Sequence, residues 1–449
     1  MARTTGRKKP VPATRLGRFA RLGIAAGEMA LGGVAQRIRS IGQDQTEPAL
    51  ELLLNTGSAK KLAGRLAGMR GAVMKMGQVL SMESSNVLPR EFADALAILR
   101  SDANTMPDSQ INRLMGRELG KGWQALFQHF DYEPIAAASI GQVHRVVAHD
   151  GRELALKIQY PGVAKSIDSD VDNMAMLLKL SRLLPGDFDV SAFIADIKAQ
   201  LKKEADYILE ADHLSHYGML LRDDPRFVVP AVHRDLSTRR VLAMDFVEGI
   251  PLESLGEQGV SQALRDEIGA ELQGLVFREL FEFRTMQSDP NFANYLYQPA
   301  SKRIVLLDFG STVCFESDFC RSYAGIANAL IEQDEESSRR YARQLGYLSA
   351  GGSEEYASQI MRIIRMVCEP IHTSGPYDFA ASDIFSRARD IGMEMFRQGG
   401  VDYVVPPPQT TYLHRKLMGS FLLCARIRAN IDVQRIIRPY LPGFTAALA

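Results

Sequence analysis

The stretch Gln287-Ser-Asp-Pro-Asn-Phe-Ala-Asn-Tyr-Leu296, followed after a short link by Ile304-Val-Leu-Leu-Asp-Phe-Gly310, decides how the rest of the chain is interpreted. It places Asp289 five residues before Asn294, and it ends an apolar, β-branched run at Asp308. Phosphoryl transfer needs such a set, because one carboxylate orients the attacking hydroxyl while an amide oxygen and a second carboxylate hold Mg²⁺. The stretch therefore predicts a site for a magnesium-loaded triphosphate.

The order of these residues also follows the kinase pattern of a catalytic loop, with Asp, four spacers and Asn, before a strand that ends in Asp-Phe-Gly. The alternative is ordinary turn chemistry, since Asp, Pro and Gly occur in loops everywhere. Because order and spacing agree jointly, we favour the catalytic interpretation of Asp289, Asn294 and Asp308.

Length and composition exclude several classes of protein. A chain of 449 residues is too long for one small core, so two lobes or domains are expected. Lys plus Arg and Asp plus Glu are both 53, which gives no argument for nucleic acid. The four cysteines form no Cys-x-x-Cys pair, so we expect neither a disulfide framework nor a zinc site. A reducing compartment is expected for such a chain. No uninterrupted apolar run is long enough to predict a spanning helix.

Residues 1–45 form a basic segment. Its first 39 residues hold nine Arg or Lys against one acid, Glu28. A helix on an anionic membrane surface is one interpretation, and a basic tail followed by a packed helix is the other. Residues 46–126 predict a helical extension in which Lys75 and Gln78, three apart, project from one side. On its own, that pair is typical of a solvated helix face.

Residues 127–250 change to a strand period, and a hairpin turn is expected at His149-Asp-Gly-Arg152. A phosphate loop would occupy its first strand, where ordinary kinases use glycines. Here Ala136, Ala137 and Ala138 precede Ser139, and because alanine disfavours a positive φ the loop should be stiffer. Lys157 on the return strand matches the kinase lysine that contacts phosphates, or else is an edge-strand lysine.

One helix is expected over about Ser191–Leu220, and it carries Glu204, Asp206 and Glu210. On a continuous helix Asp206 and Glu210 would face the same way, so that one acid could pair with Lys157 and another with Lys75. A solvated acidic face is the alternative.

Two strands, Phe227–Val232 and Val241–Val247, are expected to pair. The second would lead into an interlobe hinge at Glu248-Gly249, whose backbone would bind an adenine. Residues 251–449 then predict a helical second lobe. Within it, Tyr412–Ile437 is predicted to be one long basic helix that includes His414, Arg415 and Lys416. One interpretation is a helix that packs on the core and has a solvated basic face, and the other is a surface that faces a membrane or a partner.

Taken together, these residues resemble the UbiB family of atypical kinase-like proteins, in its coenzyme-Q biosynthesis branch. The resemblance covers nearly the whole chain and rests on these stretches: Val11–Arg18, Lys75-Met-Gly-Gln78, Ala136-Ala-Ala-Ser-Ile-Gly-Gln-Val-His144, Leu156–Val163, Glu204-Ala-Asp206, Gln287–Asn294 and Asp308-Phe-Gly310. The Lys-x-Gly-Gln stretch and the alanine-rich loop are foreign to ordinary kinases.

The resemblance implies a two-lobed, protein-kinase-like α+β fold with the N-terminal helical extension across the active site. It implies MgATP as ligand, Asp289, Lys157 and Lys75 as catalytic residues, and Asn294 and Asp308 as metal ligands. The nucleotide-binding residues that it implies are Ala136, Ala137, Ala138, Ser139, Gln142, Lys157, Gln78, Glu204, Asp206, Glu210, Met244 and Val247.

The activity implied is ATP hydrolysis or small-molecule phosphorylation that serves ubiquinone assembly at a membrane. The partners implied are quinone-biosynthesis enzymes or lipid precursors, and a homodimer stays open. Such a protein would be cytoplasmic and peripheral on the inner membrane. A conventional protein kinase and a non-catalytic, nucleotide-dependent scaffold of quinone-biosynthesis enzymes are the alternatives.

Overall fold

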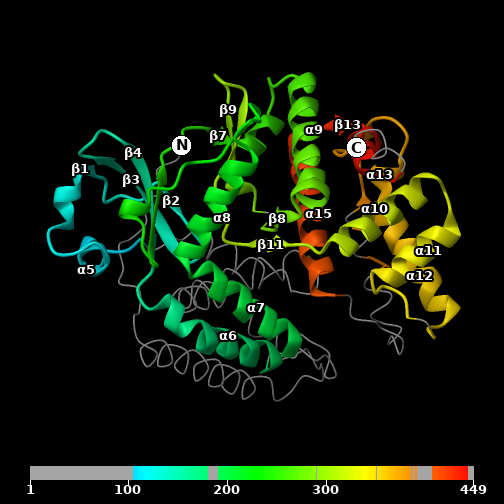
Figure 1. Ribbon diagram of the computed structural model, residues 1–449, viewed down its shortest axis with the longest axis horizontal. Helices are drawn as coiled ribbons and strands as arrows, with labels where there is room; N and C mark the ends of the chain where they lie inside the picture. The colour runs from blue at the N-terminus through cyan, green and yellow to red at the C-terminus, as the bar shows by residue number, and fades with distance from the viewer. Residues whose placement is uncertain are drawn as a thin grey trace, which may run out of the picture. The chain divides into compact units, whose positions relative to one another are not determined.

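The computed structural model describes residues 105–180, 191–289, 291–349, 351–384, 386–387, 390–391 and 407–442 (Figure 1). The predicted basic segment 1–45 and most of the predicted extension 46–126 lie outside the described residues. The chain forms two compact units: unit 1 runs to Asp212 and includes Ala231–Phe246, and unit 2 comprises His213–Pro230 and the residues from Val247 onward. The predicted boundary at 250/251 lies close to this division, but residues 213–230 belong to unit 2.

Unit 1 is built on an antiparallel sheet with the strand order β1-β3-β4-β6, in which β2 pairs with β3. The strands are β1 (Phe127–Phe130), β2 (Ala136–Ala137), β3 (Gly141–Ala148), β4 (Glu153–Gln159) and β6 (Val241–Asp245). The predicted hairpin joins β3 to β4, and Gly151 takes φ 87° in its turn, a conformation that glycine adopts freely. The register puts Lys157 opposite Val143 on one side and Leu242 on the other.

The helices of unit 1 are α5 (Asp108–Glu118), α6 (Val163–Leu180), α7 (Ser191–Glu204) and the beginning of α8 (Tyr207–Leu220), with short 3₁₀ turns at Trp123–Leu126 and Arg234–Leu236. The helices α6 and α7 lie side by side (Figure 1). At the outer end of the sheet, Trp123, Phe127 and Phe130 pack edge to face, with ring centroids 4.9 to 6.1 Å apart. This aromatic cluster anchors β1 to the segment that precedes it.

The expected pairing of Phe227–Val232 with Val241–Val247 is only partly correct. Val232 forms a bridge to Met244, whereas β5 (Phe227–Val228) runs parallel to β10 (Arg303–Leu306) in unit 2. Pro230 separates the two pairings. Because proline has no backbone N–H to give to a ladder, one continuous strand is disfavoured there.

Unit 2 contains a four-stranded sheet in the order β5-β10-β9-β7 and two short ladders, β11-β8 and β12-β13. Its remaining strands are β7 (Ile250–Pro251), β8 (Thr285–Gln287), β9 (Tyr295–Gln298), β11 (Thr312–Cys314), β12 (Tyr377–Asp378) and β13 (Asn430–Ile431). The ladder of β8 with β11 pairs Gln287 with Thr312. It therefore joins the first residue of the predicted catalytic loop to the strand that follows Asp308-Phe-Gly310.

The helices of unit 2 are the end of α8, α9 (Gln262–Arg278), a π-helical turn (Glu279–Phe283), α10 (Ser317–Ile331), α11 (Glu335–Gln344), α12 (Glu354–Val367), α13 (Glu369–His372), α15 (Pro408–Ile427) and α16 (Val433–Ile437). Short 3₁₀ turns lie at Leu252–Gly256, Phe292–Asn294 and Arg438–Tyr440. The helices α9 and α15 pack along each other (Figure 1). An apolar core lies among α10, α11 and α12, around Ile326, Leu330, Leu345, Tyr356 and Met361. None of the helices in the described ranges is both long enough and apolar enough to cross a membrane.

The predicted helix Tyr412–Ile437 is wrong in two respects. The helix α15 ends at Ile427, and the next residue, Arg428, has a φ of 58° that turns the chain out of the helix and towards β13. Its predicted basic face is also only partly solvated, because Arg415 and Lys416 are buried. The other three Arg or Lys residues of this segment, Arg426, Arg428 and Arg435, are exposed.

Candidate active site

Strand β4 places Lys157 in the interior of unit 1, where it forms an ion pair with Glu210. The Nζ atom lies 2.6 Å from Oε1 of Glu210, and both side chains are buried. The ring of Tyr207, at the start of α8, lies 5.3 Å below the ammonium. The predicted pairing of Lys157 with Glu210 is therefore confirmed, and the alternative of an edge-strand lysine is excluded because β4 lies between β3 and β6.

The alanine-rich segment is a sheet edge. Ala136 and Ala137 form β2, opposite Val143 and Gln142 of β3, and both are exposed. The backbone N–H of Ala138 donates to the carbonyl of Gly141 at 2.9 Å, so this amide is used within the protein. Ser139 donates its hydroxyl to Oε2 of Glu204 at 3.3 Å, which ties the segment to the end of α7. The stiffness predicted from the alanines stays a prediction, and the pairing of β2 with β3 is the contact that would produce it.

The predicted single helix Ser191–Leu220 is wrong, because α7 ends at Glu204 and α8 begins at Tyr207. Asp206 lies in the break. Its Oδ1 accepts from the N–H of Ile208 at 3.2 Å, as a helix cap does, and its Oδ2 pairs with Arg239 at 2.7 Å. Asp206 and Glu210 therefore do not share one helix face: Asp206 meets Arg239, whereas Glu210 meets Lys157.

Gln142 lies in the interior, with both ends of its carboxamide used by the protein. Its Oε1 accepts from the N–H of Met106 at 2.9 Å, and its Nε2 lies 2.7 Å from Nε2 of His144. His144 in turn directs Nδ1 to the carbonyl of Asp131 at 2.8 Å, so its Nε2 is the acceptor. Met244, the residue expected near the hinge, is buried on β6 opposite Ala155. Val247 is the first residue of the second part of unit 2.

The predicted catalytic loop and the Asp-Phe-Gly turn lie together in unit 2. Asn294 directs Nδ2 to Oδ2 of Asp289 at 3.3 Å, and its carbonyl accepts from Leu307 N–H at 3.0 Å. Both the N–H and the hydroxyl of Ser288 donate to the carbonyl of Ser311, at 2.9 and 2.7 Å. The turn itself is closed by Gly310, whose N–H donates to Oδ1 of Asp308 at 3.0 Å. The two halves of the stretch, 287–296 and 304–310, thus form one structure.

Phe309 anchors the turn in the core of unit 2. Its ring is buried against Tyr217, with a centroid separation of 4.5 Å. Its carbonyl accepts from Nδ1 of His213 at 3.1 Å. Asp308, next to it, is only partly buried, so the turn presents a carboxylate beside a fixed aromatic anchor.

The donor set of the loop fits a magnesium ion. Because Nδ2 of Asn294 is directed to Asp289, its Oδ1 is the atom left for a cation, and Asp308 adds carboxylate oxygen. Hard oxygen donors of this kind are the ones that Mg²⁺ prefers. In the described part of the chain, no group of three or more His, Cys, Asp or Glu side chains offers a separate metal site.

A buried polar network under the loop was missed from the sequence. Tyr217 donates to Oε1 of Glu279 at 2.8 Å, and Lys416 of α15 lies 2.9 Å from Oε2 of the same carboxylate. Burial and the neighbouring Glu279 raise the pKa of Tyr217, so it remains a phenol. Lys416 was predicted only as part of a basic helix. Nothing in the sequence pattern around Glu279 indicates that the Glu279 side chain points inward.

Two predicted site residues, Lys75 and Gln78, lie outside the described residues. The predicted pairing of Lys75 with an acid of the segment 204–210 therefore stays a prediction. Within unit 1, Glu204 accepts from Ser139 and Asp206 pairs with Arg239.

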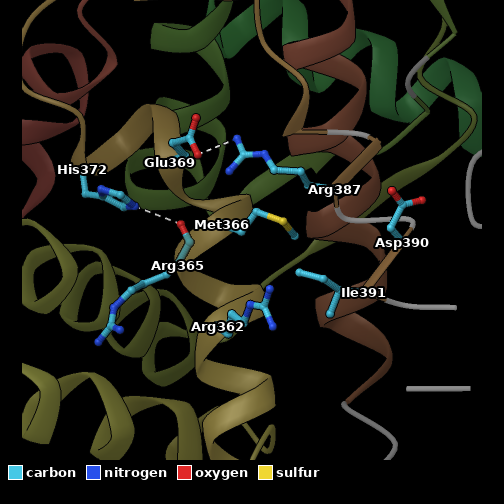
Figure 2. A pocket seen from close by; sticks show the side chains of 8 residues that line it. All are labelled: Arg362, Arg365, Met366, Glu369, His372, Arg387, Asp390 and Ile391. Atoms are coloured by element: carbon cyan, nitrogen blue, oxygen red, sulfur yellow. Dashed lines mark hydrogen bonds and ion pairs between the residues drawn. The ribbon is translucent and has the colours of Figure 1, made fainter. Parts of the chain in front are cut away.

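An open hollow in unit 2 is separate in sequence from these residues. It has a volume of about 470 Å³. Figure 2 shows its lining side chains on α12, on α13 and on the segment that holds Arg387. Its charges are mixed: Arg387 pairs with Glu369 at 2.6 Å, and Arg365 pairs with Glu335. His372 directs Nε2 to the carbonyl of Arg365 at 2.9 Å. Because carboxylates already compensate two of its guanidinium groups, this hollow gives little argument for a triphosphate site.

Comparison with known proteins identifies the family. Residues 98–342, more than half of the chain, match the ABC1 atypical kinase-like domain. The chain belongs to this family. The rat protein named atypical kinase COQ8B, mitochondrial, is 38% identical over 432 residues, which cover 95% of this chain and 80% of the rat protein. The atypical kinase COQ8 of Saccharomyces cerevisiae is 34% identical over 438 residues, or 97% of this chain and 86% of the yeast protein.

A solved member of the same fold is Rv3197 from Mycobacterium tuberculosis, determined as a complex with erythromycin. It shares 25% identity at a TM-score of 0.60, over 86% of this chain and 96% of that one. The UbiB-type resemblance and the kinase-like α+β fold are thus confirmed. As an ABC1 atypical kinase-like protein, the chain has the residue pattern of ATP-dependent phosphoryl transfer.

Proposed function

We propose that this ABC1 family member binds MgATP and cleaves its terminal phosphoryl group, which passes to water or to a small molecule in support of ubiquinone assembly at a membrane. The observation that carries this proposal is the buried pair of Lys157 and Glu210, 2.6 Å apart. A kinase lysine held by a helix glutamate is the arrangement that fixes the α- and β-phosphates. A lysine that served only structure would not need a position beside the phosphate-loop strand.

Each residue of the proposed site has a role set by its own contacts. Lys157 holds phosphate oxygens, and Glu210 fixes the direction of its ammonium. Asp289 orients the proton of the attacking water or hydroxyl, and Asn294 keeps Asp289 in place through its Nδ2. Asn294 and Asp308 would hold Mg²⁺, which when bound neutralises charge on the triphosphate. That both groups of residues act on one nucleotide stays a prediction.

The quinone and membrane parts of the proposal rest on the comparisons and on composition. They follow from the resemblance to the coenzyme-Q branch and from relatives named COQ8 that are called mitochondrial. The basic composition of residues 1–45 supports peripheral contact with an anionic membrane. Quinone-biosynthesis enzymes or lipid precursors are the proposed partners.

The decisive experiment compares ATP turnover by the parent protein and by Asp289→Asn, with and without anionic liposomes and quinone precursors. We expect turnover to fall at least about 100-fold while MgATP binding persists, because the variant loses only the proton acceptor. Asp318→Asn, at an exposed aspartate of α10, is the matched control and should turn over ATP like the parent. If Asp289→Asn fully sustains quinone synthesis and still binds nucleotide, chemistry at this site is dispensable and the scaffold alternative is correct.

A further inference from the structure

A lysine and a glutamate meet in the interior of unit 2, beneath the catalytic loop. Lys416, in the middle of α15, lies 2.9 Å (Nζ to Oε2) from Glu279, at the start of the π-helical turn after α9. Only 3% of Lys416 and 1% of Glu279 is exposed. Because well-packed apolar residues often serve stability as well as a buried ion pair does, stability alone is a weak reason for this pair.

The other contacts of the pair lie at both ends of the loop. Nζ of Lys416 donates to Oε1 of Gln287 at 3.4 Å and to the hydroxyl of Tyr295 at 3.2 Å. Gln287 stands two residues before Asp289, and Tyr295 directly follows Asn294. Oε1 of Glu279 accepts from the backbone N–H of Gln287 at 3.2 Å. One ion pair therefore fixes the residues that begin and end the loop.

Gln287 passes this constraint on to Asp289. Its Nε2 donates to the carbonyl of Asp289 at 3.0 Å, while its Oε1 faces the ammonium of Lys416. A carboxamide that donates at one end and accepts at the other has a single orientation. Without the ammonium the side chain can rotate, and the backbone at Asp289 loses this support.

The ammonium keeps its charge in this position. Burial alone would lower the pKa of Lys416, but the adjacent Glu279 carboxylate and the Tyr295 hydroxyl outweigh burial and raise it above its usual range. The contacts to Gln287 and Tyr295 are therefore made by a charged donor, which strengthens them relative to neutral hydrogen bonds.

We propose that Lys416 is a positioning residue of the catalytic loop: its ammonium fixes Gln287 and Tyr295, and through them the placement of Asp289 and Asn294, without contact to the substrate. This inference rests on the proposed function, because that function gives the loop its catalytic role. A displacement of about 1 Å in such a group can reduce a rate about 100-fold.

The test uses a charge-neutral pair of substitutions in the full chain, Lys416→Met with Glu279→Gln. The single Lys416→Met variant would leave a buried carboxylate without its cation and could fail to fold. In the double variant, residue 279 still accepts from Tyr217 and from the Gln287 N–H, but no ammonium reaches the loop. Arg426→Met is the matched control, since it removes a cation from the same helix where the side chain is 67% exposed.

Two measurements are made on each variant: hydrogen exchange of a peptide covering 285–296, and kcat and KM for ATP. In the double variant, we expect exchange in this peptide to become at least about tenfold faster, with peptides of α10 and α11 unchanged. We expect kcat to fall at least about tenfold and KM to change less than about twofold, because the loop acts on the reaction rather than on ATP binding. Arg426→Met should match the parent in both.

Unchanged exchange at 285–296 in the double variant overturns the inference, as does parental kcat. Faster exchange throughout unit 2 also overturns it, because the pair then serves stability alone. If the parent protein shows no ATP turnover, the proposed function fails, and the exchange measurement still decides whether Lys416 positions the loop.

Discussion

Gly141 and Gly151 lie in the same β3–β4 hairpin, and the structure predicts different outcomes when each is changed to alanine. A Cβ atom built on Gly141 would lie 2.5 Å from the carbonyl oxygen of Ile158 and 2.8 Å from the hydroxyl of Tyr207. A Cβ atom built on Gly151 would have no non-neighbouring atom within 4 Å, but this residue has a φ of 87°. Gly141→Ala therefore meets a packing clash, whereas Gly151→Ala meets backbone strain in open space.

The magnitudes follow from these two geometries. To reach an ordinary contact of 3.4 Å, the strands at Gly141 must separate by about 0.9 Å. Overpacking of this kind costs about 2 kcal/mol, and at about 2–4 °C per kcal/mol the thermal midpoint falls by about 4–8 °C. The left-handed conformation at Gly151 costs an alanine about 1 kcal/mol, or about 2–4 °C.

Only the first substitution should affect nucleotide binding. The carbonyl of Gly141 accepts from the N–H of Ala138 in the alanine-rich segment. The methyl group added by Gly141→Ala would displace Tyr207, which begins the helix that carries Glu210. We expect Gly141→Ala to weaken MgATP binding at least about tenfold and Gly151→Ala to change it less than about twofold, as measured by calorimetry. Equal loss of affinity in both variants, or parental stability in Gly141→Ala, would refute this reasoning.

Three further variants test the site and the core. Glu210→Gln should lower ATP turnover at least about tenfold and destabilise the protein by about 2 kcal/mol, since Lys157 loses its charged partner. The control Glu153→Gln, in an exposed ion pair on the same hairpin, should change stability by less than about 1 kcal/mol. Equal losses of stability in the two variants would contradict the role of burial. Ala138→Gly should loosen the edge strand and permit label transfer from ATP to the protein itself, and a variant without such transfer would show that this residue does not suppress protein phosphorylation. Burial lowers the pKa of His414 from 6.5 to about 4, so below pH 6.5 the folded state binds fewer protons than the unfolded state. The free energy of unfolding should therefore fall by about 2 kcal/mol between pH 7.5 and pH 5. Thermal scans should show that His414→Phe loses this pH dependence, and an unchanged dependence in that variant would refute the assignment.

Local patterns in the sequence predicted the parts of the site that lie close together in the chain. The spacing of Asp289, Asn294 and Asp308 predicted one structure, and hydrogen bonds through Ser288, Asn294 and Gly310 join that structure in unit 2. The hairpin was also predictable, because His149-Asp-Gly-Arg152 is turn chemistry between two strand-like runs.

Helical periodicity misled the prediction where a polar side chain ends a helix. Apolar spacing continues through Glu204–Glu210, so a single helix was expected, but Asp206 caps α8 and pairs with Arg239. Similarly, Arg428 ends α15 in a left-handed conformation that no spacing rule indicates for an arginine.

Charge was the least predictable property. Lys416 looks like a solvated residue in the sequence, and its burial depends on Glu279, which is 137 positions away. Such a pairing depends on tertiary packing of α15 beside α9, and a single sequence without an alignment gives no signal for it. A single sequence likewise gives no signal for the buried hydrogen bonds that join the carboxamide of Gln142 to Met106 and His144.

The pairing of Ala136–Ala137 with β3 has a consequence for the design of inhibitors. Ordinary kinases use glycines in the segment that covers the phosphates. Here the matching segment is an edge strand whose backbone is paired with Val143 and Gln142. If the proposed site is correct, a selective compound should be rigid and shaped to fit this edge strand, and compounds that need a flexible glycine-rich loop to fold over them should bind this protein weakly.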